Sequence, residues 1–145
     1  MIDQEELRLL MYRYSDAIDN RDWKMYRSCF TENAIVKVVP GSRQWPIDEL
    51  IALIGPQFAN FSGTQHIVTN HMFKIEGDKA TGTCYLRASH WCDVPGKSRE
   101  SVAWIIDGKY SDEYVRDDDG WKISIRTCSQ SRSEGSYREV VSAGS

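Results

Sequence analysis

The sequence predicts an α+β protein in which helices pack on one face of a curved antiparallel sheet. Helical spacing of apolar residues is confined to the part of the chain before residue 60, and four long stretches rich in β-branched and aromatic residues follow it. A doubly wound fold would need strands and helices to alternate, and neither that alternation nor an internal repeat is visible. The segregation of helices and strands therefore predicts the fold class.

The first helix is predicted over residues 3–19, with Asp19 at its end. One face of this segment is apolar, because its large side chains recur three and four positions apart. That stripe consists of Leu7, Leu10, Met11, Tyr14 and Ile18.

Two shorter helices are expected before residue 60, separated by a short strand over residues 34–39. Asn20 is placed to cap the second helix, which has Asp22 in its first turn. Pro46 suits the first turn of the third helix, which should close near Gly55-Pro56.

The second half of the chain is predicted to consist of strands joined by turns. Gly77-Asp78 suits a two-residue hairpin, and Asp118-Asp119-Gly120 suits a second turn. The polar segment from residue 93 to 101 holds Pro95-Gly96 and is expected to be a longer loop. The four strands are expected over residues 66–76, 79–90, 102–116 and 121–130.

Composition limits the classes of function. The net charge of −3, with scattered Lys and Arg, argues against non-specific nucleic-acid binding. No apolar run approaches the roughly 20 residues that a membrane span needs. The acidic amino terminus does not resemble a signal peptide, so a cytoplasmic location is expected. Four widely spaced cysteines and three histidines form no metal or redox motif, so no metal and no cofactor are expected.

A chain of 145 residues is expected to form one domain. We place that domain at residues 1–131. Residues 132–145 are small and polar, which predicts a mobile tail or an arm that contacts a partner.

Four stretches resemble the SnoaL-like polyketide cyclase and dehydratase group of the nuclear-transport-factor-2-like superfamily. The resemblance implies a cone-like α+β barrel, with three N-terminal helices on the concave face of the sheet. Scytalone dehydratases and hexachlorocyclohexane dehydrochlorinases are the most similar branches. The stretches are Tyr14 to Trp23, Thr64-Gln65-His66, Leu86 to His90, and Gly108 to Tyr114 followed by Gly120 to Arg126.

The resemblance also implies site residues. Asp19 and His66 match the Asp and His that both branches use, and His90 matches a second pocket histidine of the dehydratases. Arg126 matches an arginine late on the final strand of the dehydrochlorinases. Tyr14 lies on the apolar stripe of the first helix and is a further candidate, although a core tyrosine is an equal alternative.

The chain also departs from both branches. Where the dehydratases have a pocket tyrosine this chain has Ile18, and the dehydrochlorinases have a lysine near the position of Tyr14. Neither family substrate is therefore carried over to this chain.

The candidate residues suit proton transfer. A carboxylate that accepts the Nδ1–H of an imidazole fixes its tautomer and leaves Nε2 free as a base. His90 and Arg126 are expected to donate to developing negative charge. Alternation places His90 on the apolar face of its strand, whereas Arg126 shares a face with Lys122 that solvent could cover. Pattern alone suggests pocket walls at Trp45, Phe58, Phe61, Met72, Trp91 and Trp104.

The expected function is a cofactor-independent lyase that eliminates water from a small, cyclic, hydroxylated, apolar substrate by means of an Asp19–His66 dyad. Isomerisation and cyclisation are alternatives in the same pocket. A non-catalytic role in ligand binding or assembly is a further alternative, including one like that of a dioxygenase small subunit. The open sheet face suggests a homodimer or homotrimer.

Overall fold

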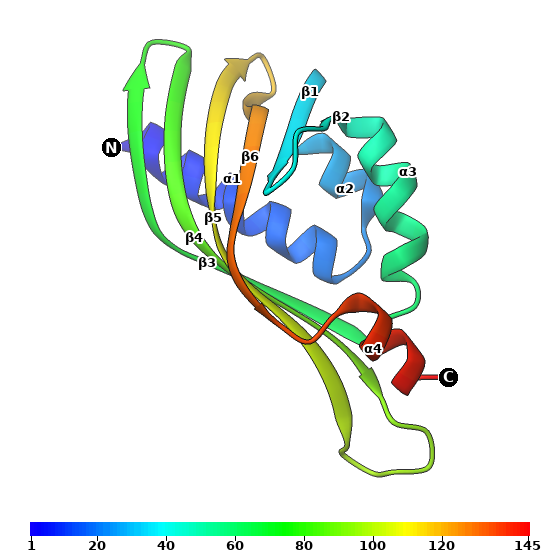
Figure 1. The fold of residues 1–145 in the computed structure, drawn as a ribbon. Helices are drawn as coiled ribbons and strands as arrows, with labels where there is room; N and C mark the ends of the chain where they lie inside the picture. Colours follow the sequence, from blue (N-terminus) through cyan, green and yellow to red (C-terminus); the bar gives the residue numbers. More distant parts are fainter.

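In the computed structural model, which describes residues 1–145, three helices precede the long strands and a fourth follows them (Figure 1). The strands form one six-stranded, strongly curved sheet, and α1 lies across its concave face. The elements are α1 (Ile2–Asp19), α2 (Trp23–Ser28), β1 (Phe30–Val39), β2 (Gln44–Pro46), α3 (Ile47–Phe58), β3 (Gly63–Glu76), β4 (Lys79–Asp93), β5 (Ser101–Asp117), β6 (Gly120–Glu134) and α4 (Tyr137–Ala143).

The sheet is mixed, with strand order β2-β1-β6-β5-β4-β3. The expectation of a purely antiparallel sheet is wrong at one position, because β1 pairs with β6 in parallel. Strands β3 to β6 form an antiparallel meander. The long connection through β2 and α3 carries the chain from β1 to the opposite edge of the sheet, and a parallel pair needs such a crossover.

The predicted stripe of α1 is buried and faces the sheet. α1 contacts mainly β3, while α2 and α3 contact β1, so the three N-terminal helices fill the cone (Figure 1). None of the four helices has the length and apolar character that a membrane span requires.

The short helices differ in detail from the expectation. Asp22 caps α2, because its carboxylate accepts the Met25 N–H at 2.9 Å. Asn20 instead closes α1 by donating to the Asp16 carbonyl at 2.8 Å. α3 continues past Pro56 to Phe58. A proline removes only one bond this close to a helix end, and the burial of Phe58 offsets that loss.

A bulge in β6 decides which way Arg126 points. Ile125 pairs with Glu113 and Ile123 with Tyr114, so Ser124 is an extra residue in β6. An extra residue reverses the alternation of faces beyond it. Arg126 therefore points into the cone and is 1% exposed, whereas simple alternation left open a position in solvent.

The carboxyl-terminal segment is ordered, in contrast to the mobile tail expected after residue 131. β6 continues to Glu134, and α4 then packs against β4 and β5. Gly135, with φ of +72°, makes the turn, and a Cβ there would lie 2.5 Å from the Ala103 carbonyl oxygen. Val140 is fully buried. Tyr137 and Val141 also pack against the core, but three apolar residues in a short polar segment were too weak a pattern to predict the helix.

Candidate functional site

The end of α1 meets the beginning of β3, and there the structure brings Asp19 and His66 together. The Asp19 Oδ1 atom lies 2.7 Å from Nδ1 of His66, and its Oδ2 accepts the His66 backbone N–H at 2.8 Å. The Thr64 hydroxyl donates to Oδ1 at 2.9 Å. The carboxylate therefore holds the ring and the backbone of His66 at once. The sequence motif contained Thr64, but its role as a donor to Asp19 was not predicted.

The edge position of β3 explains why Asp19 can bind the backbone. β3 is the last strand of the sheet, so alternate N–H groups along its outer side have no partner strand. The His66 N–H is one of these groups, and the carboxylate at the end of α1 satisfies it. The resulting geometry fixes the direction of the imidazole.

Arg21 joins the segments that surround this pair. Its guanidinium donates to the carbonyls of Asp19 (2.8 Å), Phe61 (3.3 Å) and Phe58 (3.4 Å). The residue has a φ of +54°, in the left-handed region. Arg21 thus fixes the end of α1 relative to the end of α3. Sequence reasoning did not identify it, because nothing in the local pattern shows that three separate carbonyls converge on one side chain.

The electrostatics favour an ionised Asp19. Burial raises the pKa of its carboxyl, but the hydrogen bonds and the charge of His66 outweigh burial, so the pKa lies below its ordinary value. An ionised carboxylate only accepts hydrogen bonds, so Nδ1 of His66 carries the proton. The Nε2 atom of His66 has no hydrogen-bond partner within the protein.

His90 lies next to His66, with 5.6 Å between the ring centroids and the rings nearly perpendicular. Its Nδ1 atom is 3.1 Å from the Trp104 carbonyl oxygen. Burial lowers the pKa of His90 to about 4, so the ring is neutral at neutral pH. Because a carbonyl can only accept, Nδ1 carries the proton and Nε2 carries a lone pair. In this form the free Nε2 atom of His90 can only accept a hydrogen bond, whereas the sequence led us to expect that His90 would donate to a substrate.

Aromatic side chains enclose the two histidines. Phe58 stacks on His66 and meets His90 edge-on, with centroid distances of 6.3 and 5.7 Å. The Phe61 ring lies 5.2 Å from the His90 ring, and the Trp104 ring stacks on the His90 ring at 4.6 Å. Three of the six suggested wall residues, namely Phe58, Phe61 and Trp104, therefore surround the histidines.

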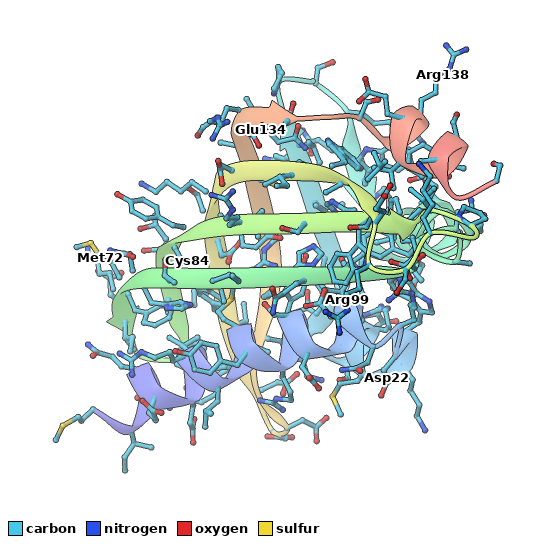
Figure 2. All side chains as sticks on the ribbon, turned by 90° about the horizontal axis from the view of Figure 1, so that it is seen from below. Asp22, Met72, Cys84, Arg99, Glu134 and Arg138 are labelled. Carbon is cyan, nitrogen blue, oxygen red and sulfur yellow. The ribbon has the colours of Figure 1, made fainter.

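The other three suggested wall residues lie elsewhere. Met72 is 73% exposed and points away from the helices (Figure 2). Trp91 follows His90 in the strand, so alternation turns it to the outer face, where its ring covers Gly63. Trp45 lies on β2, at the opposite edge of the sheet from β3, beneath the guanidinium of Arg43. Aromatic and sulfur-containing residues are typical of both faces of such a sheet, so composition could not separate them.

α4 adds an aromatic side chain that the sequence analysis placed in the tail. The Tyr137 ring lies 5.6 Å from Phe61 and 6.5 Å from Trp104. Its hydroxyl accepts a hydrogen bond from the Asn60 side chain at 3.0 Å. Tyr137 thus supports, from outside, the two rings that pack against His90.

Arg126 and Tyr14 belong to a second cluster, deeper in the cone. The Arg126 Nε and Nη2 atoms donate to the Asp112 carboxylate at 2.9 and 2.7 Å. The guanidinium lies between the rings of Tyr14 and Tyr110, at 4.2 and 3.8 Å, and the two hydroxyls are 3.2 Å apart. Arg126 is therefore the charged partner of the buried Asp112. Of the Arg126 nitrogen atoms, only Nη1 is buried without a hydrogen-bond partner.

Little open space adjoins the histidines. The His66 side chain is 5% exposed and the whole His90 residue 3%. The largest surface pocket, about 500 Å³, lies toward the outer face of the sheet, and its lining includes Thr81, Thr83 and Ser111. A ring-sized ligand would therefore enter the cone only if surrounding side chains moved.

No group of three or more His, Cys, Asp or Glu side chains is arranged as metal ligands would be. All four cysteines are free, and Cys29, Cys84 and Cys92 are buried. Burial raises the pKa of the Cys84 thiol to about 12 and that of Cys128 to about 11, so both remain protonated.

Solved structures with this fold include proteins of several kinds. A protein from Kribbella flavida is 28% identical, with 98% of each chain covered and a TM-score of 0.84. A candidate scytalone dehydratase from Novosphingobium aromaticivorans is 20% identical, covering 92% of this chain and 87% of the other (TM-score 0.79). A type 2 hexachlorocyclohexane dehydrochlorinase is 17% identical over 90% and 86% of the two chains (TM-score 0.74). At such identities the last two show the shared fold alone.

No relative with a curated description matches the chain. The family model of the SnoaL-like domain matches residues 1–127, which contain both histidines and the helix that positions them. This protein therefore belongs to the SnoaL-like domain family.

Proposed function

We propose that this protein is a cofactor-independent lyase that eliminates water from a small, cyclic, hydroxylated and largely apolar substrate. The observation that carries the proposal is the contact between Asp19 and His66. A carboxylate bound to Nδ1 fixes the tautomer and stabilises the imidazolium that forms when Nε2 takes a proton. Such a positioned base contributes about 10²–10⁴-fold in rate.

The proposed step balances within the site. Nε2 of His66 removes a proton from the carbon next to a carbonyl, and the C–H electrons form the new double bond. The C–O bond of the neighbouring carbon breaks, and the imidazolium returns the proton to the leaving oxygen, so that water departs. Asp19 remains ionised throughout, which its lowered pKa supports.

The enclosure of the histidines also supports this chemistry. Phe58, Phe61 and Trp104 exclude water from the neutral rings, and a low-dielectric surrounding strengthens the attraction between a new imidazolium and its carboxylate. Planar aromatic walls favour a flat, apolar ring as the substrate.

The proposal is tested with a panel of cyclic β-hydroxyketones, beginning with 3-hydroxycyclohexanone, with enone formation followed by absorbance. His66→Ala and Asp19→Asn are expected to lower the rate by about 10²–10⁴-fold. His71→Gln is the control, because His71 packs against Tyr12 and Phe73 and lies outside the site. Wild-type rates in both site variants would exclude the dyad. Ligand binding without any dehydration would favour a binding protein.

A further inference from the structure

The two histidines of the site are held in the same tautomer by two different acceptors. Nδ1 of His66 faces the Asp19 carboxylate at 2.7 Å, and Nδ1 of His90 faces the Trp104 carbonyl at 3.1 Å. Neither acceptor can donate, so each neutral ring carries its hydrogen on Nδ1. Each Nε2 therefore presents a lone pair, and neither has a partner within the protein.

The pair also resists carrying two positive charges. Burial makes a charge on His90 unfavourable, and a positive His66 only 5.6 Å away makes it more so. Of the two rings, only His66 has a carboxylate in contact with it. His90 is therefore the ring that stays neutral, and its Nε2 stays an acceptor while His66 gains and loses a proton.

An unsatisfied acceptor in an enclosed apolar site selects its ligand. A hydroxyl group placed against Nε2 of His90 would form a hydrogen bond. An ether or methyl group at that position would leave the lone pair buried and unpaired, and would therefore bind more weakly. A carboxylate would place negative charge beside a lone pair and near Asp19, with no Lys or Arg among the charged groups that act on His90.

We infer that the site recognises a neutral hydroxylated ring, whose hydroxyl group donates to Nε2 of His90 while the acidic C–H of the same ring faces Nε2 of His66. The second half of this statement rests on the proposed function, and the first half does not. His90 is thus a specificity-determining residue that accepts a substrate hydroxyl, and it does not stabilise an oxyanion.

Binding of matched probes tests the inference without any turnover. Indan-5-ol, 5-methoxyindane and indane-5-carboxylate share one ring system and differ in the group offered to His90. By titration calorimetry at pH 7, the alcohol is expected to bind at least about tenfold more tightly than the ether, with the carboxylate weakest. Equal affinities for alcohol and ether, tightest binding of the carboxylate, or no binding of the alcohol at millimolar concentration would overturn the inference.

Variants assign the preference to one atom. His90→Phe keeps a ring but removes the acceptor, and it should reduce the ratio of alcohol to ether affinity to about one. His90→Gln can donate to the Trp104 carbonyl and still offer an acceptor, so it should retain part of the ratio even if His90→Phe fails to fold. His71→Gln should leave the ratio unchanged. A tenfold preference that persists in His90→Phe would show that another group makes the contact.

The tautomers can be measured directly, and the two proposals can fail separately. The ¹⁵N chemical shifts of the imidazoles should show an unprotonated Nε2 in His90 at pH 7, and a protonated Nε2 there would contradict the inference. If His66→Ala abolishes dehydration while the wild type shows no hydroxyl preference, the lyase stands and the inference falls. If the wild type prefers the hydroxylated probe but shows no dehydration, the inference about His90 stands and the proposed lyase function falls.

Discussion

Two aspartates in this cone are each hydrogen-bonded to a basic side chain, Asp112 to Arg126 and Asp19 to His66. The two pairs differ in which hydrogen-bonding atoms they leave free for a ligand. Asp112 and Arg126 are both buried, and two hydrogen bonds join them between two tyrosine rings. Asp19 lies at the end of α1 with 20% of its side chain exposed, His66 lies on β3 with 5% exposed, and the outer nitrogen of the imidazole has no partner within the protein. The sealed pair leaves only the buried Arg126 Nη1 atom without a partner and no atom within reach of a ligand at the histidines, so it supports the core. The open pair keeps one reactive atom, so it is suited to chemistry.

The largest expected effect is on the sealed pair. Arg126→Met leaves the Asp112 carboxylate buried with only the Tyr114 hydroxyl as a hydrogen-bond donor, and should lower the free energy of unfolding by about 3–5 kcal/mol. Urea unfolding measures this loss. The double variant Arg126→Met with Asp112→Leu removes both charges and should recover most of it. A loss below about 1 kcal/mol in the single variant would mean that the pair is less important to the core than its burial indicates.

The stability contributed by the region around Asp19 and His66, which includes the buried His90, should instead depend on pH. The pKa of His90 is about 4 in the folded protein and 6.5 in the unfolded chain, so only the unfolded chain takes up this proton between those values. The free energy of unfolding should therefore fall as the pH falls from about 6.5 to about 4, by on the order of 3 kcal/mol. Asp19, whose pKa is lowered, adds a further loss below about pH 4.

The contribution of His90 is isolated by comparing unfolding at pH 7 and pH 4.5 in the wild type and in His90→Gln. The pKa of His71 is also lowered by burial, but His71 is present in both proteins and cancels in the difference. An equal pH dependence in the two proteins would show that His90 does not titrate as its burial suggests.

A smaller effect should separate positioning from stability. Arg21→Lys replaces a guanidinium that reaches three carbonyls, and should cost about 1–2 kcal/mol of unfolding free energy. Arg27 is a matched control, because it donates to the carbonyls of Phe30, Thr31 and Glu32 away from the site. Arg27→Lys should cost a similar amount.

Only Arg21→Lys should alter the open pair, because only Arg21 holds the backbone of Asp19. We expect changed imidazole ¹⁵N chemical shifts for His66, and a lower rate of dehydration, in Arg21→Lys but not in Arg27→Lys. Identical His66 chemical shifts and identical dehydration rates in the two variants would show that Arg21 serves only the stability of the fold.

The smallest effect concerns the hydroxyl above the sealed pair. Tyr14→Phe removes the contact with the Tyr110 hydroxyl but keeps the ring over Arg126, and should cost about 0.5–1.5 kcal/mol. Dehydration should be unchanged if Tyr14 serves only the core. A large loss of rate with little loss of stability would instead place its hydroxyl in the reaction, as the sequence analysis allowed.

Prediction from the sequence succeeded where local pattern decides the structure. The stripe of α1, the turn at Gly77 and the inward face of β4 that ends in His90 all follow from periodicity or turn chemistry. The proximity of Asp19 and His66 followed from the family resemblance. The orientation of Arg126 did not follow, because one extra residue at Ser124 reverses the alternation. Trp91 and His90 could not both face inward, because consecutive strand residues point to opposite faces.

The sequence by itself determined the fold class, because helical and strand periodicities are local properties. Its short motifs also named Asp19 and His66 as candidate site residues, through the family resemblance that they carry. The tertiary structure decided everything that depends on groups distant in the chain. It brought the Trp104 carbonyl to His90, which makes that histidine an acceptor, and the Asp112 carboxylate to Arg126, which commits that arginine to the core. It also added Tyr137 behind the aromatic walls. Each of these is a contact between side chains or backbone groups that only folding brings within hydrogen-bond or packing distance.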